Sequence, residues 1–179
     1  MSEEWKPSMR LSVLWNLLGL MLAVIGFVVF GVIAAFAAGG SVELAGLDPI
    51  WGIVLVLAGV IVTHELIHGA AMLMFGARPT FGAALVQKVM PVVYCTSPGH
   101  LFTRGQFMVV ALAPAVVLSV VGVALMPFGN LASWLMIPLA LNLGGAIGDF
   151  WMTGMLLRRE PDVLVEDLHE GLRFHYRTP

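Results

Sequence analysis

Residues 49–75, PIWGIVLVLAGVIVTHELIHGAAMLMF, decide the fold class of this chain. The stretch is apolar except for a short polar group at 63–68, which reads Thr-His-Glu-Leu-Ile-His. About 20 apolar residues are enough for a helix to cross a bilayer. We therefore predict a transmembrane helix over 49–75 that carries two histidines and a glutamate inside the membrane.

Three further apolar runs are long enough to cross a bilayer, at about 11–38, 107–128 and 131–157. Backbone groups that face lipid must satisfy their own hydrogen bonds, so each run is expected to be a helix. The predicted fold is an all-α polytopic membrane protein with four transmembrane helices. It forms a single membrane-embedded domain over 1–179, and its last part, 158–179, is a cytoplasmic tail.

The composition supports a membrane protein and excludes other classes. Only 11% of the residues are charged, against about 25% in average globular chains, and the mean hydropathy is +0.94. Apolar residues this abundant cannot all be buried inside so small a body, so the lipid bilayer must cover much of the surface. A net charge of −2 gives no indication of nucleic-acid binding. The single cysteine, Cys95, rules out an intrachain disulfide and a cysteine-based zinc cluster.

Lysine and arginine residues predict how the chain is oriented. They occur before the first span, between the second and third spans, and after the fourth span, whereas the other two connections contain none. Cytoplasmic loops carry the excess of positive charge. We therefore predict a multi-pass protein of the cell membrane with both termini and the 76–106 loop in the cytoplasm. The residues concerned are Lys6, Arg10, Arg78, Lys88, Arg104, Arg158 and Arg159.

The 76–106 loop and the tail have patterns of their own. Residues 80–89 and 91–96 look like two short strands, which predicts a short β-hairpin-like loop between the second and third helices. A linker that lies on the membrane is an equal alternative. In the tail, Pro161 and Gly171 bracket a predicted helix over 161–170, and residues 172–177 alternate like a strand.

The chemistry of the chain centres on His64-Glu65-Leu66-Ile67-His68. Residues four apart on a helix share a face, with Cβ atoms about 5–6 Å apart, so both imidazoles can reach one metal ion. Glu65 can then take a proton from a metal-bound water and later deliver it to a leaving amine. Zinc lowers the pKa of that water towards about 7. A polar packing cluster without metal is the alternative, but two histidines and a glutamate in lipid are costly without stabilisation.

Asp149 is the candidate third ligand. A catalytic zinc usually has three protein ligands and an open position, and Glu65 and Asp149 are the only acidic residues in the four predicted spans. At 1.5 Å per residue, the two histidines and Asp149 both lie roughly 14–15 Å inside the cytoplasmic ends of their helices. A carboxylate that hydrogen-bonds to a neighbouring helix is the alternative.

Two other polar residues are weaker candidates for the site. Asn142 lies two turns before Asp149, and could donate a hydrogen bond to a substrate carbonyl or tie helices together. His100, in the 76–106 loop, is either a transition-state stabiliser or a surface histidine. His169 and His175 lie in the tail and are assigned no role.

The motif resembles that of known membrane proteases. His64-Glu65-Leu66-Ile67-His68 in a transmembrane helix, with an aspartate two spans later, is similar to the intramembrane zinc metalloproteases of the site-2 type. The size and four-span layout resemble a bacterial and archaeal family described as zincin peptidases. The 80–96 loop and the 165–171 tail are also similar to that family. The chain departs from the site-2 pattern in having Phe150 after the aspartate, and glycines at 144 and 145 where prolines are common.

The resemblance implies an activity and roles for four residues. His64, His68 and Asp149 would bind zinc, Glu65 would be the general base, and an extended peptide could add to the edge of the 80–96 segment. The hypothesis is a zinc-dependent integral-membrane endopeptidase that cuts membrane proteins or peptides near the cytoplasmic face. Water would reach its active site through a cavity between the second, third and fourth helices. The alternative is a non-catalytic zinc-binding membrane scaffold or assembly factor, which would not need Glu65.

Overall fold

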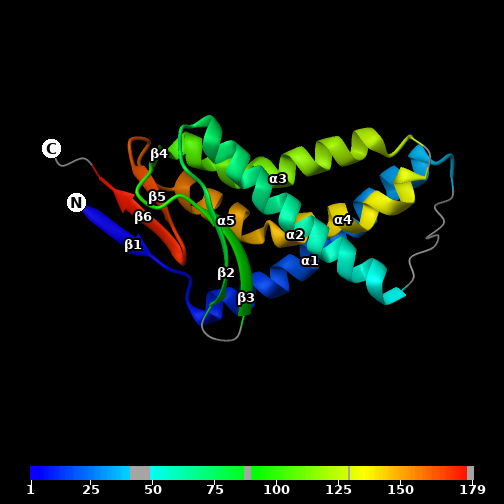
Figure 1. The fold of residues 1–179 in the computed structure, drawn as a ribbon, viewed down its shortest axis with the longest axis horizontal. Coiled ribbons are helices and arrows are strands. Elements are labelled where there is room, and N and C mark those ends of the chain that lie inside the picture. The colour runs from blue at the N-terminus through cyan, green and yellow to red at the C-terminus, as the bar shows by residue number, and fades with distance from the viewer. Residues whose placement is uncertain (41–48, 87–89, 129, 177–179) are drawn as a thin grey trace. The chain divides into compact units, whose positions relative to one another are not determined.

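The computed structural model describes residues 1–40, 49–86, 90–128 and 130–176. These parts of the chain form five helices and six strands (Figure 1). Their contacts divide the chain into two compact units. Unit 1 comprises Met1–Leu14, Glu65–Ala113 and Gly148–Pro179, and unit 2 comprises Trp15–His64 and Pro114–Ile147.

Three helices are long and apolar enough to cross a membrane: α1 (Met9–Ala37), α2 (Pro49–Met74) and α3 (Arg104–Leu125). A fourth crossing is available if α4 (Leu131–Gly145) and α5 (Ile147–Leu157), which are bent by 42° at the break between them, count as one span. These helices confirm the prediction of a mostly helical chain with several candidate membrane spans.

The predicted helix over 131–157 is not continuous, because it breaks at Ala146. The backbone N–H of Ala146 still donates to the carbonyl of Asn142 at 3.0 Å, so this residue caps the end of α4. Gly144 and Gly145 precede the break, and glycine destabilises a helix by about 1 kcal/mol relative to alanine. The apolar run predicted the span, but the glycines within it decided where the helix bends.

Unit 2 is held together by small and apolar residues. Buried side chains of α1 and α4, among them Phe30 and Leu139, form one cluster with Met126, which directly follows α3. A Cβ atom on Gly19 would lie 2.8 Å from the carbonyl oxygen of Gly144, and one on Gly144 would lie 2.6 Å from that of Gly19. The two glycines therefore let the backbones of α1 and α4 approach closely, as small residues do in membrane helices.

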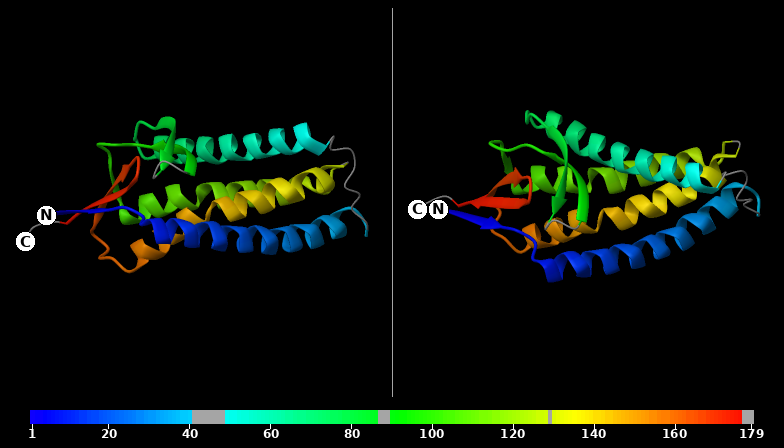
Figure 2. Two further views of the ribbon diagram at one scale, coloured as in Figure 1. Left: turned by 90° about the horizontal axis from the view of Figure 1, so that it is seen from below. Right: turned by 60° about the horizontal axis from the view of Figure 1, so that its bottom comes forward.

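Unit 1 contains a four-stranded antiparallel sheet in the order β1-β6-β5-β4. Its strands are β1 (Ser2–Trp5), β4 (Leu101–Thr103), β5 (Leu164–Leu168) and β6 (Gly171–His175). Both views of Figure 2 show β1 beside β6, so the two ends of the chain meet in one sheet.

The sheet corrects two predictions. The fold is not all-α, and the predicted helix over 161–170 is wrong, because 164–168 form a strand. β5 pairs with β4 on one side and with β6 on the other, so its backbone groups are satisfied by segments that the local sequence does not reveal. The expected strand at 172–177 is present as β6, as far as residue 175.

A second sheet consists of β2 (Thr80–Val86) and β3 (Met90–Thr96), which pair in antiparallel register. They lie between α2 and α3 in the chain, as do the two predicted strands at 80–89 and 91–96. Residues 87–89 fall outside the described part of the chain.

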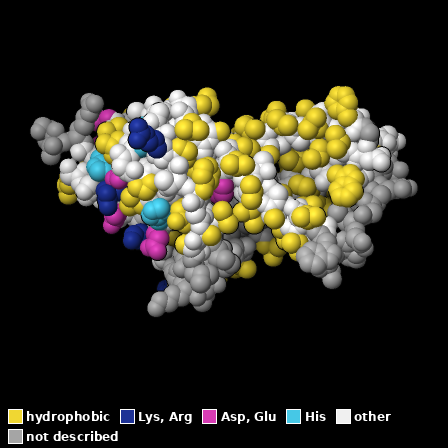
Figure 3. Space-filling model, in the orientation of Figure 1, with side chains coloured by type: hydrophobic (Ala, Val, Ile, Leu, Met, Phe, Trp, Pro, Cys, Tyr) yellow, Lys and Arg dark blue, Asp and Glu magenta, His cyan; other side chains and the backbone are white. Residues whose placement is uncertain are grey.

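One face of the four-stranded sheet is apolar and packs into the core of unit 1. Phe102, Val165 and Phe174, from three different strands, are fully buried there together with Leu156 of α5 and Val110 of α3. On the side of the molecule drawn in Figure 3, charged side chains and histidines gather over the strands, and hydrophobic side chains cover the helices.

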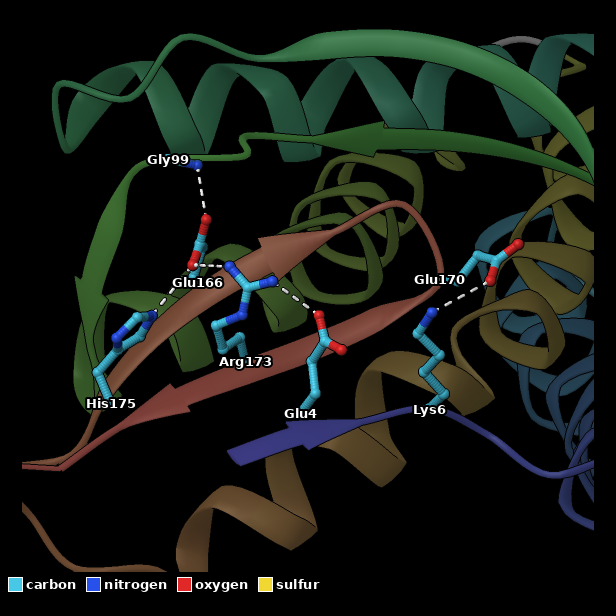
Figure 4. Close-up of polar contacts among 7 residues, drawn as sticks. All are labelled: Glu4, Lys6, Gly99, Glu166, Glu170, Arg173 and His175. Atoms are coloured by element: carbon cyan, nitrogen blue, oxygen red, sulfur yellow. Dashed lines mark hydrogen bonds and ion pairs between the residues drawn. The ribbon is translucent and has the colours of Figure 1, made fainter. Parts of the chain in front are cut away.

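The other face of that sheet is polar and centres on Glu166 (Figure 4). Its carboxylate accepts hydrogen bonds from the backbone N–H of Gly99 at 2.9 Å, from Arg173 at 3.0 Å and from His175 at 3.0 Å. Burial acts to raise the pKa of Glu166, but the hydrogen bonds from His175, Gly99 and Arg173 outweigh it and hold the pKa below its usual value. Arg173 also bonds Glu4 of β1 at 2.7 Å, which ties the N-terminal strand to β6.

Candidate metal site

The position of His68 depends on a proline in another helix. His68 lies on α2, and its Nδ1 is 2.9 Å from the backbone carbonyl oxygen of Val110 on α3. In a regular helix this carbonyl would accept the N–H of residue 114, but Pro114 has no N–H. A carbonyl can only accept, so Nδ1 of His68 carries the proton and donates it. Nε2 then carries the lone pair, which is the form of the ring that can bind a metal.

Nε2 of His68 faces the carboxylate of Asp149 on α5. The two atoms nearest each other are Nε2 and Oδ1, 3.5 Å apart, and each residue is only 8% exposed. This distance is longer than a normal N–H···O hydrogen bond. Two ligands of a tetrahedral zinc ion, each about 2.0–2.2 Å from the metal, lie about 3.3–3.5 Å apart. The pair is therefore spaced as two ligands of one ion.

His64 lies one turn before His68 on the same helix and is oriented in the same way. Its Nδ1 is 2.9 Å from Oδ1 of Asn142, and Nδ2 of Asn142 donates to the carbonyl of Pro114 at 3.3 Å. The Pro114 carbonyl requires a donor, which fixes the orientation of the Asn142 amide. Oδ1 must then accept from His64, so the proton of His64 is on Nδ1 and the lone pair is on Nε2.

One ligand atom from each of His64, His68 and Asp149 lies within 4.8 Å of the other two. Two neutral imidazoles and one carboxylate form a donor set that suits zinc and leaves a fourth coordination position for water or substrate. The residues fit the metal in the chemistry of the donors and in their spacing. They lie close enough together to bind a metal ion.

Glu65 is placed in unit 1 with other ionisable groups. Its negative charge acts on two partly or fully buried side chains outside the membrane spans, those of Cys95 and Asp167. Burial raises the pKa of the Cys95 thiol to about 12, and the charges of Glu65 and Asp167 contribute. Burial also raises the pKa of Asp167 well above its usual range, and the charges of Asp149 and Glu65 add to the effect.

The other candidates lie elsewhere within the described residues. The ring of His100 packs edge-on against Phe102 with centroids 4.4 Å apart, at the start of β4. The ring of His169 packs in the same way against Tyr94, at 5.0 Å, and His175 bonds Glu166. None of these three histidines belongs to the group of possible ligands found in the described parts of the chain.

Sequence reasoning missed Pro114. A proline in the middle of an apolar run frees one helical carbonyl, and this was the available signal for it.

Unit 2 contains an apolar cavity of about 340 Å³ lined by α2, α3 and α4. Thr63 and Asn142 are the polar residues of its wall, and the rest of the wall is formed by aliphatic side chains, proline and glycine, as at Val60, Gly122 and Pro138. The water route that the sequence led us to expect between these helices stays a prediction.

Comparison with known proteins places the chain within a family. A family model described as "Putative zincin peptidase" matches residues 57–164, which is more than half of the 179 residues and includes the three possible ligands and Glu65. No curated protein and no solved structure matches the chain.

Proposed function

The chain belongs to the zincin peptidase family, and from this premise we propose that it is a zinc-dependent integral-membrane endopeptidase. Its substrates are membrane-associated proteins or peptides, cut near the cytoplasmic face. The observation that carries the proposal is the convergence of His64, His68 and Asp149, whose ligand atoms lie within 4.8 Å of one another. Nδ1 of each histidine lies 2.9 Å from an oxygen acceptor outside this ligand group, which puts the lone pair of each ring on Nε2.

The residues have distinct roles in this proposal. His64, His68 and Asp149 hold the zinc ion, which when bound polarises water and the substrate carbonyl. Glu65 accepts a proton from water as the water oxygen adds to the peptide carbonyl carbon. It then delivers this proton to the amide nitrogen as the C–N bond breaks, so that the amine leaves neutral. Asn142 and the Val110 carbonyl orient the two imidazoles.

The pairing of the strands supports a four-span topology. β1, β4 and β5 belong to one sheet, so they lie on one side of the membrane. The chain must then cross an even number of times between β1 and β4, and again between β4 and β5. Between β1 and β4 the two crossings are α1 and α2. Between β4 and β5 the first crossing is α3, and the bent pair of α4 and α5 is the only candidate for the second in the described residues. The positive charges of the connecting segments favour the cytoplasm for this side.

The β2–β3 pair is a candidate for substrate binding. Within the described residues the two strands pair only with each other, so each has an edge without a strand partner. An extended peptide can add to such an edge through backbone hydrogen bonds. A peptide must be extended before a hydrolase can reach its amides, so this edge would present the substrate in the required conformation.

The test uses the full chain purified and reconstituted in liposomes with a library of membrane-anchored peptides. We expect about one zinc ion per chain and cleavage that the Glu65→Gln variant loses while keeping its zinc. The Glu170→Gln variant, which changes an exposed glutamate of the β5–β6 turn, should cleave like the wild type.

Three results separate the proposal from its alternatives. Cleavage by Glu65→Gln at the wild-type rate would exclude Glu65 as the general base. Zinc binding without any cleavage would favour the non-catalytic scaffold. Absence of zinc even after it is supplied would refute the metal site.

A further inference from the structure

The cavity of unit 2 reaches one of the possible metal ligands. Helices α2, α3 and α4 form its wall, and its volume is about 340 Å³. Two residues of the wall, Thr63 and Asn142, are polar, and both adjoin His64. Thr63 precedes His64 on α2, and Oδ1 of Asn142 lies 2.9 Å from Nδ1 of His64. A group that enters the cavity therefore lies beside a residue that the proposed function assigns to zinc.

The rest of the wall suits an apolar group that comes from the bilayer. Val60, Leu118 and Leu135 line the cavity from three different helices. Sites for small ligands commonly have volumes of about 300–1,000 Å³, mostly apolar walls and a few polar groups, and they occur between the helices of bundles. Gly59 and Thr63 in the wall are exposed, so the cavity opens to the surface of a helix that is apolar enough to cross a membrane.

Two glycines shape the cavity in different ways. A Cβ atom on Gly122 of α3 would lie 2.6 Å from Cδ2 of Leu139, so this glycine lets α3 and α4 pack closely beside the cavity. A Cβ atom on Gly59 of α2 would meet no heavy atom within 4 Å, although Gly59 belongs to the wall. Position 59 is therefore a place where a larger side chain can fill the cavity without displacing its wall.

The polar end of the cavity suits a peptide better than a lipid chain. Thr63 and Asn142 place a hydroxyl and an amide there, which a peptide backbone can hydrogen-bond and a hydrocarbon chain cannot. The wall residues of α2, from Val56 to Thr63, all precede His64 and extend about 10 Å along the helix. In the proposed topology the end of α2 that follows His68 is cytoplasmic. The cavity then lies on the side of the metal ligands that faces the middle of the membrane.

From these observations we propose that the cavity is a specificity pocket, which receives one large aliphatic or aromatic side chain of the substrate. The residue that carries this side chain lies on the membrane-centre side of the peptide bond that is cut. The proposal rests on the proposed function and narrows its substrate class. The substrates are membrane proteins that carry a large apolar residue next to the cleaved bond, on that side.

Membrane-anchored peptides that differ only in having leucine or alanine at one position test the pocket in liposomes. The position is varied on each side of the cut in turn. One methylene in an apolar pocket changes kcat/KM by about 10- to 200-fold. We therefore expect the wild type to prefer the leucine peptide by at least about 10-fold at one position on the membrane-centre side.

Gly59→Leu fills the pocket, so the ratio of kcat/KM for the two peptides should fall to about 1. Its zinc affinity should stay unchanged, which shows that the metal site is intact. Gly31→Leu is the matched control and should keep the wild-type ratio. A Cβ atom on Gly31 of α1 also meets no heavy atom within 4 Å, but Gly31 lies outside the cavity wall.

A larger pocket gives a second measurement, which decides the matter if Gly59→Leu does not fold. Val121 of α3 lines the cavity and is 49% exposed. Val121→Ala should raise kcat/KM for a phenylalanine peptide relative to the leucine peptide by about 10-fold. Val120→Ala is the control, because Val120 is 63% exposed and lies outside the wall.

The outcomes separate the pocket from the proposed function. A wild type that cleaves both peptides equally well would overturn the pocket and leave the peptidase intact. So would a Gly59→Leu variant that slows both peptides by the same factor, since this is the result expected if the cavity holds a lipid chain. A wild type that binds no zinc or cleaves no peptide would overturn the proposed function, and the pocket with it.

Discussion

Replacing Asn142 by alanine tests whether the orientation of His64 matters for zinc binding. Asn142 is 1% exposed, accepts from Nδ1 of His64 at 2.9 Å and donates to the Pro114 carbonyl at 3.3 Å. Alanine removes both hydrogen bonds. The imidazole then loses the acceptor that holds its proton on Nδ1, and the tautomer with a proton on Nε2, which cannot bind zinc, becomes accessible.

The size of the effect follows from the two bonds. Loss of an outer partner of a metal-binding histidine lowers affinity by about 10- to 100-fold, or about 1.4–2.7 kcal/mol. Each buried polar group left without a partner costs about 1–3 kcal/mol of stability. Asn142→Ala should therefore bind zinc more weakly and also melt at a lower temperature than the wild type.

Chelator competition in detergent measures the affinity, and thermal unfolding of the zinc-free protein measures the stability. Asn142→Asp restores the oxygen acceptor for His64, so it should recover most of the zinc affinity lost by the alanine variant. Asn130→Ala is the control, because Asn130 stands at the start of the same helix and makes no side-chain capping bond. Wild-type zinc affinity in Asn142→Ala would refute the reasoning.

Two further predictions concern the Val110 carbonyl that accepts from His68, and the four-stranded sheet. Pro114→Ala gives residue 114 an N–H that competes with His68 for the Val110 carbonyl. Zinc affinity should fall by about 2- to 10-fold, which corresponds to the loss of one hydrogen bond, while the melting temperature should rise or stay the same. An unchanged zinc affinity would contradict the role of the Val110 carbonyl. The pKa of Glu166 is held below its usual value near 4.5, so the stability it contributes is present above that pH and is lost as the pH falls through its folded pKa. Zinc-free wild type should thus lose more melting temperature between pH 7 and pH 4 than Glu166→Gln does, and parallel curves would show that Glu166 is not responsible.

The parts of the fold that depend on short-range physics were predictable. Apolar length predicted the helices, and the helical repeat predicted that His64 and His68 share a face. Depth in the membrane indicated Asp149 as the third ligand, because two helices that end at one membrane surface bring residues at equal depth to the same level. Each inference uses a distance fixed by helix geometry, which does not depend on how the rest of the chain folds.

Apart from β6, which its alternating residues predicted, the four-stranded sheet was not predictable from the local pattern. β1 and β5 are stabilised by partners at the other end of the chain or far along it, and their own few residues did not indicate a strand. Residues 161–170 carry the signals of a helix, a proline at the start and a glycine at the end. The backbone hydrogen bonds that β4 and β6 offer to β5 outweighed this preference.

The environment of the two histidines shows how a metal site can be built in lipid at low polar cost. A metal-binding imidazole needs an acceptor for its second nitrogen, yet each added polar side chain in a membrane span is expensive. Pro114 supplies one acceptor without adding a polar side chain, because it frees the Val110 carbonyl that His68 uses. The carbonyl of Pro114 itself holds the Asn142 amide that serves His64. The proline therefore acts directly on the acceptor of His68, whereas the carbonyl that holds the Asn142 amide would be present with any residue at position 114.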